Sequence, residues 1–167
     1  MAGAMDRVKD RGQGWREQIS PFLESLGIVV FNPITKPTDM GLEDSDTHTI
    51  KSKLKASRRY DELSSMMKVI RSVDLRLVDI SDFLIVNLDL DVHPCGTYEE
   101  LYLSNRSKKP ILLHIEQGKQ NTPDWLFGTL PHEWFFSSWD DLKHYLLLVN
   151  QESANIDLKN RWRFFNV

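Results

Sequence analysis

The sequence has a single cysteine, Cys95, and no long apolar run among its 167 residues. One thiol cannot form an intrachain disulfide, and no cysteines stand at zinc-binding spacing, so a disulfide scaffold and a zinc finger are both excluded. No apolar run approaches the roughly 20 residues that span a bilayer, and the first residues lack the apolar core of a signal peptide. We therefore expect a cytoplasmic protein without a membrane partner.

A strong excess of one charge is also missing. The net charge is −3 at pH 7, so no general basic field attracts nucleic acid, and we expect no nucleic-acid partner. One local basic patch is left open, made by Lys51, Lys53, Lys55, Arg58 and Arg59. The length and the hydrophobic content of 41% are those of an ordinary globular chain and predict one domain over residues 1–167.

Helical spacing of apolar residues predicts four helices. They cover residues 15–26, 60–73, 96–106 and 139–149. Gly27 is a natural stop for the first helix, and Ser138 or Ser137 is a candidate N-cap for the last one. Pro21 lies inside the first pattern, which predicts a late start or a kink there.

Short apolar runs predict strands over residues 28–31, 83–88 and 111–115. A first strand before the loop of residues 2–6 is almost absent from the sequence. We expect a short helix over residues 75–80, and residues 35–57 read as a long loop with some helix. Strands separated by helices predict parallel pairing through right-handed crossovers.

Polar residues follow the apolar run 82–88 at the point where its strand should end. Asn87, Asp89 and Asp91 stand there, and in open α/β sheets this carboxyl edge is where ligands bind. We interpret them as site residues; the alternatives are solvated loop residues, or a magnesium site made by Asp89, Asp91 and Glu100.

Two glutamates begin the helix that follows, after Gly96 and Thr97. Glu99 and Glu100 point about 100° apart around a helix, so one can face a site while the other faces solvent. A glutamate among other acids is a candidate nucleophile or general base. Asp74 is a further candidate, because no capping role explains it. The small residues of segments 2–6 and 12–16 would let backbone amides approach a ligand; the alternative is a disordered N-terminus.

Taken together, these motifs resemble the nucleoside 2-deoxyribosyltransferase family. Its members open with a strand and a loop like residues 2–6, and they carry an aspartate where this chain has Asp74, eight residues before Asp82. Their nucleophile is a glutamate in a Gly-Thr-x-x-Glu pattern, which here runs from Gly96 to Glu100. Segments 12–16 and 161–165, together with residues 74–100 and Pro110, look like the branch common in phage genomes. The resemblance spans residue 2 to about residue 116.

The resemblance implies an α/β fold of three layers, with a mostly parallel central sheet of Rossmann- or flavodoxin-like type. It implies transfer of a 2-deoxyribosyl group between nucleobases through a covalent intermediate on Glu100, with Asp74 as the second catalytic residue. It implies no cofactor and no metal, a deoxynucleoside and a nucleobase as ligands, and the host cytoplasm where a phage encodes the protein. The implied substrate-binding residues are Gly3, Met5, Asp6, Trp15, Asn87, Asp89, Asp91, Gly96 and Thr97.

The sequence departs from the family pattern in two places. The first strand is clipped, and Pro94 stands where better-known members have an aspartate, six residues before the nucleophile. Asp89 or Asp91 takes over that contact with the base, or the contact differs. A homo-oligomer is expected, in which the aromatic tail 161–167 packs on a second copy and helps to complete or cover the site. The alternative is that the tail packs on its own subunit.

Two other functions fit the same motifs. One is a hydrolase of 2′-deoxynucleoside 5′-monophosphates, with the basic loop 3–16 holding the phosphate through Arg7, Lys9, Arg11 and Arg16. The other is a nucleotide-binding module without catalytic activity.

Overall fold

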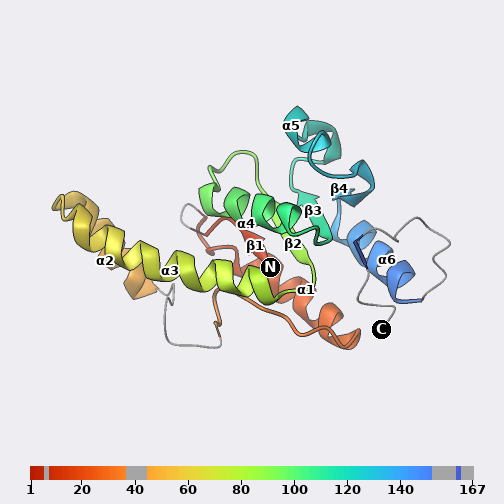
Figure 1. Ribbon diagram of the computed structural model, residues 1–167, viewed down its shortest axis with the longest axis horizontal. Coiled ribbons are helices and arrows are strands. Elements are labelled where there is room, and N and C mark those ends of the chain that lie inside the picture. Colours follow the sequence, from red (N-terminus) through yellow and green to blue (C-terminus); the bar gives the residue numbers. More distant parts are fainter. Residues whose placement is uncertain (6–7, 37–44, 152–160, 163–167) are drawn as a thin grey trace. The chain divides into compact units, whose positions relative to one another are not determined.

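The computed structural model describes residues 1–5, 8–36, 45–151 and 161–162 (Figure 1). The chain divides into two compact units. The first, which we call the sheet unit, comprises Met1–Val30 and Asp82–Val167. The second, the hairpin unit, comprises Phe31–Ser81. We describe each by itself, and one domain over residues 1–167 stays a prediction.

The sheet unit is built on parallel strands. In the described residues they are, in order across the sheet, β1 (Ala2–Gly3), β2 (Leu84–Leu88), β3 (Ile111–Ile115) and β4 (Phe135–Phe136). β2 and β3 pair along their full length, whereas β1 adds only two pairs. Every strand residue is buried, which is typical of a parallel sheet covered on both faces. The predicted parallel α/β sheet is confirmed.

Helices cover both faces of this sheet. On one face, α1 (Gln13–Ser25) and α6 (Trp139–Asn150) share a hydrophobic cluster with Ile85 of β2 and Leu112 of β3. Strand side chains alternate between faces, so the neighbours of these two residues point to the opposite face. There α4 (Cys95–Arg106) runs beside the strands and buries Leu101 (Figure 1). The result is the three-layer, Rossmann- or flavodoxin-like arrangement that the sequence predicts.

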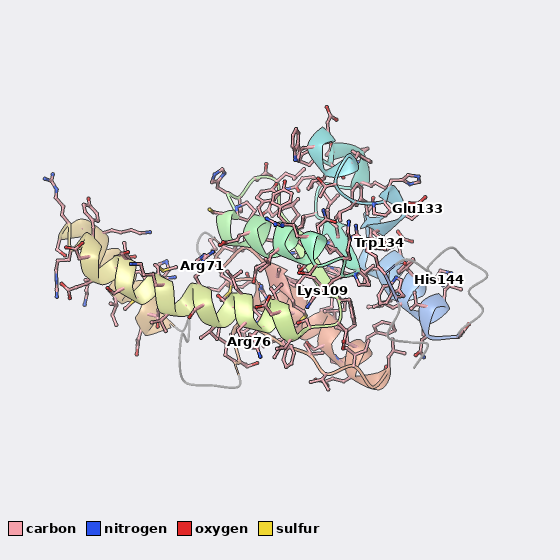
Figure 2. The ribbon with its side chains drawn as sticks, in the orientation of Figure 1. Arg71, Arg76, Lys109, Glu133, Trp134 and His144 are labelled. Carbon is pink, nitrogen blue, oxygen red and sulfur yellow. The ribbon has the colours of Figure 1, made fainter. Side chains whose placement is uncertain are left out.

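Local signals explain the ends of these helices. The hydroxyl of Ser138 accepts a hydrogen bond from the backbone N–H of Asp141 (3.1 Å), which is the predicted N-cap of α6. α1 contains Pro21 and begins before the predicted start. Trp134, labelled in Figure 2, precedes β4 and packs in the same cluster as α6, where its indole N–H donates to the hydroxyl of Tyr145 (2.9 Å).

The predicted strand over residues 28–31 is wrong, because none of these residues joins the sheet. Ile28 and Val30 still pack against the hydrophobic cluster, while Val29 is 79% exposed. The segment therefore buries two of its apolar side chains without pairing as a strand. β1, with only two residues, offers little backbone for another strand to pair with.

Between β3 and β4 the chain makes short elements that the sequence did not predict. They are η1 (Lys119–Asn121), α5 (Asp124–Phe127) and η2 (His132–Trp134). β4 itself has two residues, too few for a periodic pattern to reveal.

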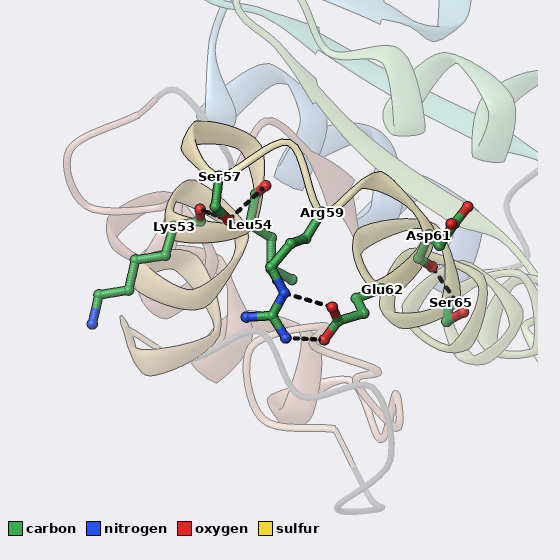
Figure 3. Close-up of polar contacts among 7 residues, drawn as sticks. All are labelled: Lys53, Leu54, Ser57, Arg59, Asp61, Glu62 and Ser65. Atoms are coloured by element: carbon green, nitrogen blue, oxygen red, sulfur yellow. Dashed lines mark hydrogen bonds and ion pairs between the residues drawn. The ribbon is translucent and has the colours of Figure 1, made fainter.

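The hairpin unit contains α2 (Ser45–Ala56) and α3 (Tyr60–Ile80). Its turn is closed by Ser57, whose hydroxyl donates to the carbonyl of Lys53 (2.8 Å), and by the ion pair of Arg59 with Glu62 (Figure 3). The sequence predicted a helix over 60–73 and a separate one over 75–80. That separation is wrong: no Gly or Pro interrupts the segment, and α3 is continuous.

Candidate functional site

A hollow of about 170 Å³ lies at the carboxyl edge of β1 and β2. Here α1 follows β1 on one face of the sheet, while α4 follows β2 on the other. Such a switch point is where open α/β sheets bind their ligands. We call this hollow the edge pocket; it is lined by Ala4, Val8, Asp10, Gly12, Trp15, Asn87, Asp89 and Glu116.

The loop after β1 forms one wall and is fixed by its own hydrogen bonds. The carboxylate of Asp10 accepts from the backbone N–H groups of Gly14 (3.0 Å) and Gly12 (2.9 Å), and these bonds lower the pKa of Asp10. Gly12 has a φ of 69°, and a Cβ there would lie 2.8 Å from the carbonyl oxygen of Ala4. A glycine is therefore required where the loop closes.

Arg16 holds this loop in place through hydrogen bonds to its backbone. Its side chain is fully buried, and its guanidinium donates to the carbonyls of Gly12 (2.8 Å) and Gly3 (3.2 Å). Its charge is thus directed at the backbone of the loop. Arg16 positions the loop and does not present a phosphate-binding group to the edge pocket.

A chain of hydrogen bonds joins two lining residues, Asn87 and Glu116, to the buried His114. Nδ2 of Asn87 donates to Oε1 of Glu116 (2.8 Å), and Oδ1 of Asn87 lies 2.7 Å from Nδ1 of His114. Asn87 and His114 are only 5% and 7% exposed. Burial lowers the pKa of His114 to about 4, so its ring is neutral at physiological pH.

Aromatic rings stack beside this chain. The ring of Trp139 lies 4.1 Å from that of His114 and 5.3 Å from that of Trp15, with interplanar angles of 20° and 9°. The guanidinium carbon of Arg16 also lies over the Trp15 ring, 4.4 Å from its centroid. Trp15 therefore adds apolar surface to the lining of the edge pocket, beside Ala4 and Val8, and its ring faces are taken up by Trp139 and Arg16.

The loop after β2 is held by Gln117. Its side-chain amide donates to Oδ1 of Asp89 (2.7 Å) and, at 3.2 Å, to Oδ2 of Asp91, while its oxygen accepts from the backbone N–H of Leu90 (3.0 Å). Asp89 lines the edge pocket. Asp91 is exposed and is not among the lining residues.

α4 carries the candidate nucleophile. Thr97 is buried, Glu100 is half-buried on the flank of the same helix face, and Glu99 is exposed. Glu99 thus faces solvent, and a position of Glu100 at the site stays a prediction. Gly96 is exposed, and neither it, Thr97 nor Glu100 lines the edge pocket.

The remaining predicted site residues fall in different places. Gly3 ends β1, where a Cβ would come within 2.9 Å of the Trp15 ring, so its lack of a side chain lets Trp15 approach the strand. Met5 is half-buried beside the lining residue Ala4, and Asp6 lies outside the described residues. Asp74 belongs to the hairpin unit, so its convergence with Glu100 stays a prediction.

Sequence reasoning missed four residues of this site. Glu116 directly follows β3, as Asp89 follows β2. Because ligands of open α/β sheets bind at the carboxyl ends of the strands, the sequence could have predicted Glu116 as a site residue in the same way as Asp89. His114 is buried in β3, as a residue of a central strand should be, but it also adjoins Asn87. No sequence signal brings Trp139 to Trp15 or Gln117 to Asp89, because both contacts depend on the tertiary fold.

Within the described residues, no three His, Cys, Asp or Glu side chains gather closely enough to hold a metal ion. The alternative of a magnesium site made by Asp89, Asp91 and Glu100 therefore has no support there. No helix in that part of the chain has the length and apolarity needed to cross a membrane. No family model and no curated protein matches this sequence.

Proposed function

We propose that this protein cleaves the N-glycosidic bond of a 2′-deoxynucleoside and transfers the 2-deoxyribosyl group to another nucleobase. The observation that carries the proposal is the edge pocket, where the Trp15 ring shares one hollow with the polar side chains of Asn87, Asp89 and Glu116. Apolar surface beside a few convergent hydrogen-bonding groups suits a heterocyclic base. The reaction itself follows from the resemblance of residues 74–100 to the deoxyribosyltransferases.

The chemistry proceeds in two displacements. In the first, a carboxylate oxygen of Glu100 bonds to C1′ of the sugar while the bond from C1′ to the base nitrogen breaks. The base leaves with the electron pair and takes a proton from an acid, for which Asp89 and Asp74 are the candidates. In the second, a nitrogen of the incoming base attacks C1′, the ester bond to Glu100 breaks, and the acid recovers a proton. Two inversions give net retention at C1′.

Surrounding carboxylates support this route electrostatically. Positive charge develops on the sugar as the glycosidic bond breaks, and negative groups nearby stabilise it. Asp89 takes this role where Asp74 is the acid, and Gln117 holds it in place, since the amide fixes one of its oxygens. No cofactor takes part in these steps.

The proposal includes a homo-oligomer. The edge pocket, at about 170 Å³, is smaller than the roughly 300–1,000 Å³ of pockets that enclose a drug-sized ligand. It has room for a base but needs further walls to enclose a whole nucleoside. Residues of a second copy would supply such walls.

The test follows deoxynucleosides by chromatography, with and without an added acceptor base. We expect a new deoxynucleoside when the acceptor is present, and a deoxyribosyl adduct on the peptide containing Glu100 when the acceptor is left out and the reaction is quenched with acid. Hydrolysis of 2′-deoxynucleoside 5′-monophosphates without transfer would instead establish the hydrolase. Binding of nucleosides without any turnover would establish an inactive module.

A further inference from the structure

The contacts behind Glu116 fix which atoms the edge pocket presents to a ligand. A carboxylate only accepts hydrogen bonds, so Asn87 turns its Nδ2 toward Glu116 and its Oδ1 toward His114. The facing Nδ1 of His114 must then carry the hydrogen. The order of donors and acceptors is thus set along the whole chain of contacts.

The backbone holds this arrangement in place. The N–H of Glu116 donates to the carbonyl of Leu88 (3.0 Å), which ties residue 116 to the end of β2. His114 is clamped by the stacked ring of Trp139 at 4.1 Å. Turning the Asn87 amide over would place its oxygen against the carboxylate, so the chain of contacts resists rearrangement.

We propose that Glu116 is a specificity-determining residue that selects nucleobases bearing an amino group, with Asn87 and His114 as its positioning residues. Among the described residues, Asn87 donates to Oε1 of Glu116, and Oε2 can accept a hydrogen bond from a ligand in the edge pocket. This inference rests on the proposed function, because it takes the ligand to be a nucleoside.

The apolar lining is the reason to assign the base, and not the sugar, to Glu116. Ala4, Val8 and Trp15 line the same hollow as Glu116, so a base packed against them would direct its polar edge at the carboxylate. The hydroxyl-bearing sugar suits such apolar surface less well than a base does. An exocyclic amino group donates the hydrogen bond that Oε2 can accept.

Glu116→Gln tests the assignment with little change in shape. In this variant the amide oxygen can still accept from Asn87, and the amide nitrogen then replaces Oε2. The position facing the ligand changes from an acceptor to a donor, which opposes an amino group. We expect the preference for amino-substituted bases to fall at least about tenfold, since hydrogen bonds to charged groups contribute that much.

Calorimetry would measure binding of deoxyadenosine and of purine 2′-deoxyriboside, which lacks only the amino group. Deoxycytidine and 2-pyrimidinone 2′-deoxyriboside form a second pair. Each is titrated into the full chain carrying Glu100→Ala, so that turnover does not consume the ligand, with and without Glu116→Gln. Glu24→Gln is the matched control, because Glu24 is exposed on α1 outside the edge pocket.

Asn87→Leu separates positioning from folding. A merely structural Asn87 would lower the melting temperature and leave the ratio of the two affinities unchanged. A positioning Asn87 would reduce that ratio, and adding Glu116→Gln would then change it little further, because the two residues act as a unit.

The outcomes distinguish this inference from the proposed function. An amino preference that Glu116→Gln abolishes, in a protein that never transfers deoxyribose, supports the inference and overturns the function. Transfer with an amino preference that survives Glu116→Gln overturns the inference alone. Equal weakening of both members of a pair would assign Glu116 to the sugar hydroxyls and overturn it as well. Absence of binding to either pair would overturn both.

Discussion

Nζ of Lys36 lies 2.8 Å from Oδ1 of Asp74, and the side chain of Lys36 is fully buried. The candidate catalytic aspartate is thus one half of an ion pair within the hairpin unit. Removing one partner from a buried pair leaves an uncompensated charge, which is strongly destabilising. Any loss of activity in an Asp74 variant therefore has two possible origins.

Substitutions of both partners separate these origins. We expect Asp74→Asn and Lys36→Met each to lower the free energy of unfolding by about 3 kcal/mol, measured by chemical denaturation. The double variant Lys36→Met/Asp74→Leu should recover most of that stability, because two apolar side chains replace the pair. Its deoxyribosyl transfer should stay low. Recovery of transfer along with stability would assign Asp74 a structural role only.

His114 predicts how stability depends on pH. Burial lowers its pKa to about 4 in the folded protein, against roughly 6.5 for an ordinary histidine. The unfolded chain therefore binds a proton in the window between these values while the folded chain does not. The free energy of unfolding should fall by up to about 3 kcal/mol as the pH drops through this window.

The measurement compares wild type with His114→Gln by denaturation between about pH 7 and pH 4.5. The glutamine amide can still donate to Asn87 but does not titrate, so this contribution to the slope should disappear. His144→Gln is the control, because His144 is exposed (Figure 2). Parallel curves for wild type and His114→Gln would show that His114 is protonated in the folded protein as well.

The central elements could be predicted because their patterns are strong. β3 lies where the apolar run 111–115 placed it, and α4 begins one residue before its predicted start. Ser138 marked the start of α6 through a cap that depends only on local sequence. Such signals do not need tertiary contacts to be recognised.

The failures arise where tertiary context decides. Residues 28–31 have the composition of a strand, but a strand also needs a partner with free backbone groups, and β1 is two residues long. In the site, Asn87 and Asp89 could be predicted because they stand at the carboxyl end of a strand, and Glu116 could have been predicted in the same way. The stack of Trp15 on Trp139 joins the first and last described helices, and single-sequence patterns do not report such pairings.

The two neighbouring glutamates of α4 give a direct test of the nucleophile. Glu100→Ala should reduce kcat/KM for deoxyribosyl transfer by at least about 10³-fold, because the covalent step is removed. Glu99→Ala, one residue away and exposed, should have a mild effect. If Glu99→Ala lost activity and Glu100→Ala did not, Glu99 would be the nucleophile. If both variants stayed fully active, neither glutamate would be the nucleophile.

The described part of the C-terminal tail packs on its own chain. Trp162 is 4% exposed, and its indole N–H donates to the hydroxyl of Tyr145 (3.1 Å), which also accepts from Trp134 (2.9 Å). Trp162 is therefore not available as an interface residue, and the homo-oligomer stays a prediction that depends on other surfaces. Mass measurement in solution of the full chain would test it.

Tyr145→Phe removes one acceptor from two buried donors. Each indole N–H that loses its partner costs about 1–3 kcal/mol, so we expect the free energy of unfolding to fall by about 2–6 kcal/mol in total. Tyr102→Phe is the matched control: Tyr102 is 38% exposed on α4, and its hydroxyl can reach water. If the two variants lost equal stability, the indole groups would have found other acceptors, and the Tyr145 hydroxyl would not be what anchors Trp162 to the core.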